Sequence, residues 1–168
     1  MTDERRAAFD ALFGNHYVGV LRYLRRRVSA EADAEDLAGD VFRIAWEKQD
    51  PREPLSRSWL FKVAADALND LYRRQGRRAS AEVALARRIE ESSAPLSVDD
   101  RLALTDAVLD LSPREQEALR LTYWEGLSAA EIAEVLDCGT SAVWALLSRA
   151  RTRLHNAMTE REPSGGAK

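Results

Sequence analysis

Apolar side chains recur at spacings of three and four residues along almost the whole chain, which is the period of an amphipathic α-helix. Signals for β-strands are almost absent, and the 168 residues include only 8 Gly and 5 Pro. The spacing therefore predicts an all-α protein. The stretch 79–98 is polar and lacks a strong apolar stripe, so we expect a flexible linker there. It would join two small helical domains, 1–78 and 99–160, and a disordered tail would follow at 161–168.

Three helices are expected in the first domain. The first carries an apolar stripe within residues 9–28, and the second carries one within 37–45, with Asp33 as its N-cap. A polar loop with two prolines, KQDPREPLSRS, separates the second helix from the third. The third helix should begin near Ser56 or Ser58, because serine is a favoured N-cap.

Two strong helix-start signals occur in the second domain. In LSPREQEAL, Ser112 would be the N-cap, Pro113 would take the first helical position and Glu115 would close a capping box. LSAAEIAEVL repeats the capping box with Ser128 and Glu131. A new helix is therefore expected after each serine.

The segment LSAAEIAEVLDCGTSAVWALLSRAR, residues 127–151, predicts two short helices joined by a tight turn. Asp137 in the turn tolerates the left-handed conformation better than most residues, and Thr140 or Ser141 can cap the second helix. The residues that this second helix should bury are Val143, Leu147, Ala150 and Leu154. A compact trihelical unit with a basic second helix suits docking into DNA, and the alternative is a structural helical hairpin.

The second helix of this segment carries apolar residues where a DNA-reading helix is expected to place basic ones. Trp144 and Leu146 occupy its start, which we expect to be exposed. At 100° per residue, the outward-facing side chains are Ala145, Ser148, Arg149 and Thr152, with Trp144 and Arg151 on one flank. Base reading by Trp144 or Ala145 would be apolar, for instance against thymine methyl groups.

Charge is distributed unevenly along the chain, although the formal net charge of −3 at first argues against a nucleic-acid partner. Residues 31–50 hold seven acidic side chains against two basic ones, and residues 99–140 hold ten against three. Residues 70–90 hold six basic side chains against three acidic ones, and residues 141–161 hold four against one. Local patches determine the field that a polyanion meets, although each run could also be a solvated helix face.

The composition argues against several classes of protein. No run of about 18 apolar residues is present and the N-terminal residues lack an apolar signal core, so we expect a cytoplasmic protein without membrane insertion. The single cysteine, Cys138, and the isolated His16 and His155 predict no disulfide, no metal site and no cofactor. No nucleophile triad, paired carboxylates or Gly-rich phosphate loop indicates a catalytic residue, so an enzyme is the least favoured class.

Three segments together resemble the extracytoplasmic-function (ECF) branch of bacterial sigma factors. AEDLAGDVFRIAWE is similar to the family's region 2.2, SWLFKVAADALNDLYRRQGRR to regions 2.3 and 2.4, and the segment from LSPREQEAL to LSRARTRL to region 4. The resemblance extends over residues 9–157. It implies a protein without enzymatic activity that binds RNA polymerase core, directs it to selected promoters and helps to open the duplex.

The resemblance also implies which residues contact each partner. Region 2.2 would dock on the coiled coil of the polymerase β′ subunit through Asp36, Leu37, Asp40, Val41 and Phe42. Regions 2.3 and 2.4 would take the −10 element through Trp59, Phe61, Lys62, Asp66, Arg73, Arg74, Arg77 and Arg78. The loop 48–58 corresponds to a pocket for an extruded base. Region 4 would take the −35 element through Ser128, Thr140, Ser141, Trp144, Ala145, Ser148, Arg149 and Arg151. The polymerase β flap and an anti-sigma factor are further implied partners.

Several positions depart from the family's pattern. Trp144 and Leu146 stand where basic residues are usual, Asp66 replaces an asparagine, and Ala65 replaces an arginine. These departures slightly favour an adaptor that binds polymerase but has lost promoter reading. A dimeric helix-turn-helix regulator, with residues 9–78 as a sensor or dimerisation domain, is the other alternative. The AEDL segment and the helix that follows it argue against that regulator.

Overall fold

The computed structural model describes residues 2–75 and 98–161, and it contains no β-strand within these ranges. The helical class that the apolar spacing predicts is therefore confirmed. The chain forms two compact units, residues 1–84 and 85–168. The expected linker and tail lie outside the described residues, except for their helical ends Val98 and Arg161, and so do Arg77 and Arg78.

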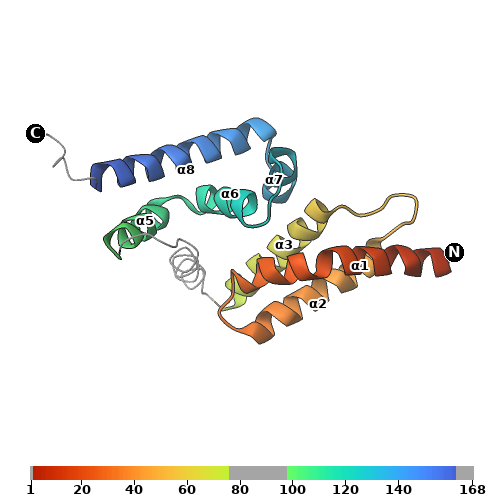
Figure 1. Cartoon of the computed structure of the whole chain (residues 1–168). Helices are drawn as coiled ribbons and strands as arrows, with labels where there is room; N and C mark the ends of the chain where they lie inside the picture. The colour runs from red at the N-terminus through yellow and green to blue at the C-terminus, as the bar shows by residue number, and fades with distance from the viewer. Residues whose placement is uncertain (1, 76–97, 162–168) are drawn as a thin grey trace, which may run out of the picture. The chain divides into compact units, whose positions relative to one another are not determined.

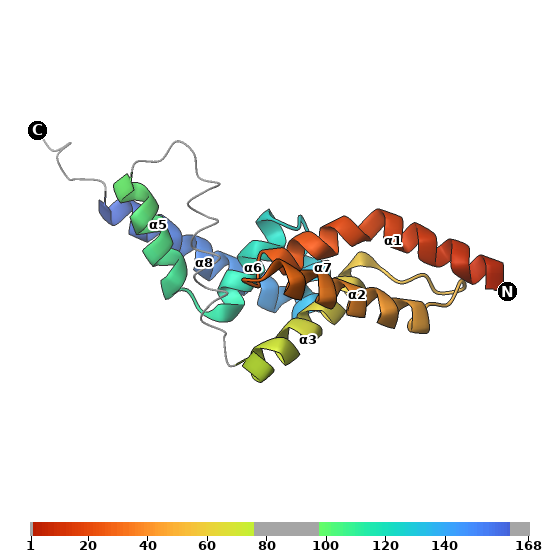
Figure 2. The same cartoon turned by 90° about the horizontal axis from the view of Figure 1, so that it is seen from below.

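The first unit is built from three helices that pack against one another (Figures 1 and 2). They are α1 (Thr2–Arg25), α2 (Glu31–Lys48) and α3 (Arg57–Gln75). Each buries an apolar face, which is the main favourable contribution to folding. The shared core includes Val20, Leu24, Ala34, Leu37, Ala38, Val41, Ala45, Leu60, Ala64 and Leu68. Three of the core residues on α2 are alanines, whose small side chains allow its neighbours to approach closely.

The starts of α2 and α3 are capped differently. Ala30 is the N-cap of α2, and its carbonyl already accepts hydrogen bonds from the Asp33 and Ala34 N–H groups at 3.1 and 3.3 Å. Asp33 thus lies within the first helical turn, and the prediction that it is the N-cap was wrong. Ser56 Oγ accepts a hydrogen bond from the Trp59 N–H at 3.1 Å, which confirms the predicted start of α3 near Ser56.

A buried arginine ties the end of α1 to α3. Arg27 is 1% exposed; its Nη1 donates to the Tyr23 carbonyl at 2.9 Å, and its guanidinium carbon lies 3.7 Å from the Tyr23 ring centroid. This cation–π contact offsets part of the cost of burying the charge. The Tyr72 hydroxyl in turn donates to the Arg27 carbonyl at 2.7 Å. The contact anchors the last turn of α3, which carries Arg73 and Arg74.

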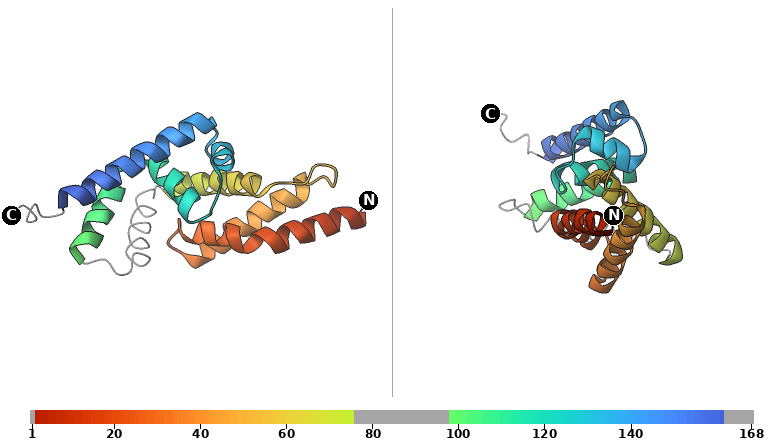
Figure 3. Two further views of the ribbon diagram at one scale, coloured as in Figure 1. Left: turned by 45° about the horizontal axis from the view of Figure 1, so that its top comes forward. Right: turned by 90° about the vertical axis from the view of Figure 1, so that its right-hand side faces the viewer.

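The second unit contains α5 (Val98–Asp110), α6 (Pro113–Tyr123), α7 (Ala129–Leu136) and α8 (Thr140–Arg161). The long α8 packs against each of the other three helices, with α7 beside its N-terminal end (Figure 3). The core of the unit includes Ala107, Val108, Leu111, Ala118, Leu121, Ile132, Val135, Val143, Leu147 and Ala150. One face of α8 is therefore committed to packing, and the other face remains accessible.

Serine side chains cap α6 and α7 as predicted, but only α7 has a complete capping box. Ser128 Oγ accepts from the Glu131 N–H at 3.2 Å, and Glu131 Oε1 accepts from the Ser128 N–H at 3.1 Å. Ser112 Oγ accepts from the Glu115 N–H at 3.1 Å. The Glu115 carboxylate does not complete the second box, because it is buried and accepts a hydrogen bond from Arg153 Nη1 at 3.4 Å.

The turn between α7 and α8 has the geometry of a helix-turn-helix. Asp137 caps α7 with a φ of 53°, which confirms that it adopts the left-handed conformation. The Val143 N–H donates to the Gly139 carbonyl at 3.2 Å, so Gly139 precedes α8 at the N-cap position. The expected cap at Thr140 or Ser141 was therefore placed too late, because both residues already lie in the first turn.

Candidate DNA-binding and protein-binding surfaces

The helix α8 buries the stripe that the sequence predicts. Val143, Leu147 and Ala150 are buried, and Leu154 is half-buried. Leu146 was expected to be exposed, but it is only 7% accessible and belongs to the core. Its burial completes the spacing of zero, three, four and seven from Val143, which is the wide apolar face of a helix that packs on several neighbours.

The residues expected at the −35 element lie in the second unit, with Ser128 at the start of α7 and the other seven on α8. All are exposed: Ser128, Thr140, Ser141, Trp144, Ala145, Ser148, Arg149 and Arg151. On a helical wheel Ser141, Ala145 and Ser148 occupy the middle of the exposed face of α8. Trp144 and Arg151 lie on one flank of these small residues, and Arg149 lies on the other. We call this the α8 face.

Two arginines on α8 contact side chains of α6. Arg151 Nε donates to the Tyr123 hydroxyl at 3.0 Å, and Arg153 Nη1 donates to Glu115 Oε1 at 3.4 Å. Glu115 is 5% exposed and Tyr123 is 64% exposed. Sequence reasoning missed both contacts and Arg153 itself. Arg153 follows Arg149 by four residues, which places both on the same flank of α8. This spacing was the sequence signal that could have pointed to Arg153.

Residues expected at the −10 element share one face of α3. Trp59, Lys62, Asp66 and Arg73 fall within about 60° on a helical wheel. Trp59 and Lys62 are half-buried, whereas Asp66 and Arg73 are exposed. Arg73 forms an ion pair with Asp70 one turn earlier, so part of its charge is compensated. The exposed Arg74 lies beside this face.

Phe61 does not belong to the exposed surface of α3. It is 5% accessible, and its ring centroid lies 5.3 Å from that of Tyr23. The two-residue spacing from Trp59 turns Phe61 about 200° around the helix and into the core. The DNA contact expected of Phe61 stays a prediction, and it would require the ring to leave the core.

A pocket lies between α1 and the loop that joins α2 to α3. The sigma-factor resemblance implies a pocket for an extruded base at this loop, residues 48–58. The volume of the pocket is about 270 Å³. Polar groups of Asn15, His16, Gln49 and Asp50 line it together with apolar residues such as Leu55. The pocket thus combines hydrogen-bond donors and acceptors with apolar walls, which suits a flat polar ring.

The environment of His16 predicts a pH-dependent stability. Burial, and secondly the positive charge of Arg57, lower the pKa of His16 below its usual 6.5. The folded protein therefore binds this proton less readily than the unfolded chain, so stability is full above about pH 6.5 and declines as the pH falls through the folded-state pKa. Urea unfolding at pH about 7.5 and about 5.5 should show a larger acid-induced loss for the wild type than for His16→Gln. An equal loss in both proteins would contradict this prediction.

The helix α2 exposes carboxylates and buries apolar side chains. Asp36 and Asp40 are exposed, whereas Leu37, Val41 and Phe42 are 4%, 0% and 3% accessible. The polymerase contact expected of these three apolar residues stays a prediction, and in the free protein they are buried in the core of the first unit. They hold the helix in place, and its accessible surface is acidic.

An aromatic cluster between α1 and α2 was not recognised from the sequence as a unit. It consists of Phe9, Phe13, Tyr17, Phe42 and Trp46, whose neighbouring ring centroids lie 4.6 to 6.5 Å apart. Phe13 and Trp46 remain 39% and 37% exposed. Trp46 thus adds accessible aromatic surface to α2, the helix that carries the exposed Asp36 and Asp40, whereas Phe13 is on α1.

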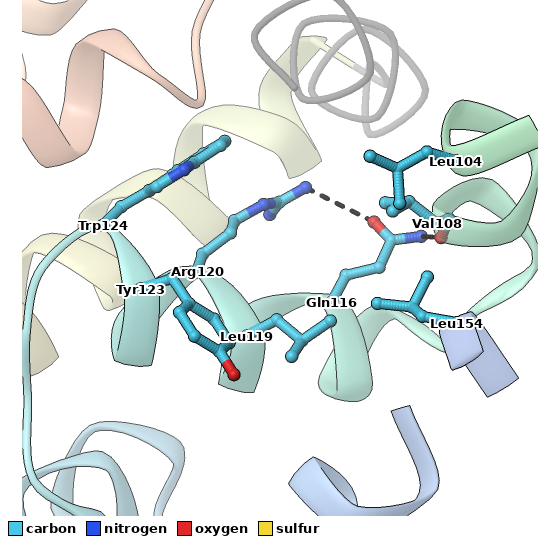
Figure 4. A pocket seen from close by; sticks show the side chains of 8 residues that line it. All are labelled: Leu104, Val108, Gln116, Leu119, Arg120, Tyr123, Trp124 and Leu154. Carbon is cyan, nitrogen blue, oxygen red and sulfur yellow. Dashed lines mark hydrogen bonds between the residues drawn. The ribbon is translucent and has the colours of Figure 1, made fainter. Parts of the chain in front are cut away.

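The second unit has an apolar pocket of about 180 Å³ between α5, α6 and α8 (Figure 4). Leu104, Val108, Leu119 and Leu154 contribute aliphatic walls. One wall is polar: Gln116 Nε2 donates to the Val108 and Leu111 carbonyls at 2.9 and 3.1 Å, and Arg120 Nη2 donates to Gln116 Oε1 at 3.3 Å. Sequence reasoning did not find this pocket.

A three-helix unit followed by a helix-turn-helix unit is the architecture that the sigma-factor resemblance implies, and family models agree. Those described as Sigma-70 region 2 and Sigma-70 region 4 match residues 12–78 and 101–154. The chain belongs to the sigma-70 family, and the ECF sigma factors to which it is 30% identical place it in the ECF branch. It is therefore a non-enzymatic factor that directs promoter-specific transcription initiation.

Several curated relatives share this assignment. The chain is 30% identical over 152 residues to the ferric citrate uptake sigma factor FecI of Escherichia coli. The aligned segment covers 84% of the chain and 86% of FecI. It is 30% identical over 159 residues to the ECF sigma factor SigL of Mycobacterium tuberculosis, with 90% and 85% covered. The ECF sigma factor BldN of Streptomyces coelicolor is 30% identical over 153 residues, which are 85% of the chain but only 57% of BldN.

Solved structures show the same fold. CnrH in complex with the cytosolic domain of CnrY superposes with a TM-score of 0.64 and 28% identity, and the match covers 94% of this chain and 91% of CnrH. The sigma factor RpoE of Bartonella quintana, in complex with the anti-sigma factor NepR, superposes with a TM-score of 0.61 and 23% identity. That match covers 92% of this chain and 98% of RpoE.

No helix within residues 2–75 and 98–161 is long and apolar enough to cross a bilayer. In the same part of the chain, no group of three or more His, Cys, Asp and Glu side chains is placed to hold a metal ion.

Proposed function

We propose that the first unit binds RNA polymerase core and the −10 element, and that the second unit binds the −35 element. The observation that carries the proposal is the α8 face, on which small side chains lie between two arginine-bearing flanks. Polymerase would be the partner that brings both units to one promoter, so the protein would act in the cytoplasm.

At the −35 element, α8 would enter the major groove. Ser141, Ala145 and Ser148 are short enough to let the helix backbone approach the base edges closely. Arg149 and Arg151 would contact phosphates on either side of the groove, and the N-terminal end of α8 would contribute its positive dipole. Ala145 and Trp144 would read thymine methyl groups through apolar contacts.

At the −10 element, α3 would contact the DNA backbone and stack on a base, and the neighbouring pocket would bind an extruded base. Lys62, Arg73 and Arg74 would contact backbone phosphates, and the half-buried Trp59 offers a ring against which a base can stack. An extruded base would enter the pocket lined by Asn15, His16 and Gln49, whose polar atoms could pair with a Watson–Crick edge.

Polymerase would contact each unit. The exposed Asp36 and Asp40 suit a basic helical partner such as the β′ coiled coil, since complementary charge speeds and directs association. The pocket of the second unit is walled by leucines and suits an apolar side chain from the β flap. The CnrH and RpoE complexes support the proposal that an anti-sigma factor also binds this chain.

Run-off transcription with purified core polymerase and sheared genomic DNA of the source organism tests this proposal. We expect transcripts with discrete 5′ ends that require the protein, and these ends would identify its promoters. No transcript despite tight core binding would indicate the adaptor. Specific, tight DNA binding by the isolated chain at physiological salt, without transcription, would indicate an ordinary helix-turn-helix regulator. Weak binding is expected instead, because residues 99–140 hold ten acidic side chains against three basic ones.

A further inference from the structure

We propose that Tyr123 is a positioning residue of the α8 face, which orients Arg151 for a DNA phosphate before the promoter binds. The inference rests on the proposed −35 function of α8. Tyr123 ends α6 and Arg151 lies 28 residues later in the chain, so the fold alone brings them together.

Two contacts hold Arg151 against Tyr123. Its Nε donates to the phenolic oxygen at 3.0 Å, and its guanidinium carbon lies 5.7 Å from the ring centroid. Tyr123 is 64% exposed and stands at the rim of the apolar pocket, with its hydroxyl turned away from Arg120 and Gln116 (Figure 4). Arg151 is exposed as well, and it does not line the pocket.

The atoms used in this contact leave the phosphate-binding edge of Arg151 accessible. A guanidinium binds a phosphate best through two parallel N–H groups. Because Tyr123 takes Nε, the terminal Nη1 and Nη2 groups together can still face a phosphate. An arginine that is ordered in advance loses less side-chain entropy when it binds. The contact therefore favours binding without adding any direct contact with DNA.

The opposite flank of α8 shows why a phenol suits this role better than a carboxylate. Arg153 faces the buried carboxylate of Glu115 at 3.4 Å, so its charge is compensated within the unit. A phenol is a neutral hydrogen-bond partner, so Tyr123 orients Arg151 and leaves its full positive charge for the polyanion. The same helix, α6, thus neutralises one α8 arginine and presents another.

The test uses holoenzyme reconstituted from core polymerase and the full chain, with the strongest promoter found by run-off transcription as a labelled duplex. Tyr123→Phe keeps the ring and removes the hydroxyl. It should weaken promoter binding by about two- to tenfold, the range expected when one long side chain must be ordered on binding. Thermal unfolding of the free protein should be unchanged.

A double-mutant cycle separates positioning from a structural role. In an Arg151→Ala background, Tyr123→Phe should have no further effect, because the residue that it orients is absent. In the matched Arg149→Ala background, Tyr123→Phe should cause its full loss. Arg151→Ala itself should weaken binding and reduce the salt slope by about one unit.

The other outcomes would contradict either the positioning role of Tyr123 or the proposed function of α8. An unchanged or increased affinity of Tyr123→Phe would overturn the inference, as would an equal loss in the Arg151→Ala background. If Arg151→Ala leaves both affinity and salt slope unchanged, the phosphate contact proposed for α8 is wrong as well. The failure of the inference and the failure of the proposed function are thereby distinguishable.

Discussion

Reversing the charges of Asp36 and Asp40 to lysine is expected to weaken binding to core polymerase by more than about 30-fold, since like charges set against each other at an interface cost several kcal/mol. Both side chains are exposed on α2, and the apolar residues between them are already buried. Electrostatics would therefore carry more of this contact than hydrophobic burial. Binding of fluorescently labelled protein to core polymerase, titrated at several salt concentrations, measures the effect.

The control for this prediction is an equal charge change elsewhere on the first unit. Glu4 and Asp10 are exposed on α1, so Glu4→Lys/Asp10→Lys alters the net charge by the same amount. This variant should bind core polymerase nearly as well as the wild type, and both variants should keep the helical circular-dichroism spectrum. Equal weakening by the two variants would show that only the total charge matters, and unchanged binding of the α2 variant would contradict the proposed dock.

Local signals in the sequence predicted local structure well. The serine caps at Ser112 and Ser128, the left-handed Asp137 and the buried stripe that includes Val143 depend on residues within about one or two helical turns. Such features require no knowledge of what packs against the helix. The whole helical architecture follows from them, because every helix in the described ranges carries an apolar face that needs a partner.

The features that the sequence did not predict depend on contacts between residues that are far apart in the chain. Leu37, Val41 and Phe42 match a docking motif, but only the packing of α1 and α3 shows that they are covered. Glu115 has the right spacing for a capping box, yet Arg153, 38 residues later, takes its carboxylate. The accessible surface of a residue is therefore a better guide to its role than its match to a sequence motif.

Leu146 and Trp144, two residues apart, also show that accessibility and not residue type decides the role of a side chain. Both stand where the family usually has a basic side chain, and the sequence alone suggested one exposed apolar spot. The structure separates them: Leu146 is 7% accessible and Trp144 is 55% accessible. One replacement extends the core of the second unit, whereas the other changes the α8 face that we propose to meet DNA.

Substitution by alanine should therefore have opposite consequences at these two positions. Leu146→Ala should lower the free energy of unfolding by about 2–5 kcal/mol, as is usual for a buried leucine that leaves a cavity. Trp144→Ala should cost less than about 1.5 kcal/mol, because most of its side chain is accessible. Urea unfolding followed by circular dichroism measures both values.

Transcription should rank the two variants in the reverse order at a temperature where both remain folded. Trp144→Ala should reduce promoter-dependent transcription much more than it reduces core binding, because it removes an apolar contact from one flank of the α8 face while the proposed dock on α2 is untouched. Leu146→Ala should transcribe normally once the second unit is folded. If Trp144→Ala instead unfolds the unit, its side chain is part of the core and the proposed α8 face is wrong. If it transcribes normally, base reading depends on Ala145, Ser148 and the flanking arginines without the indole.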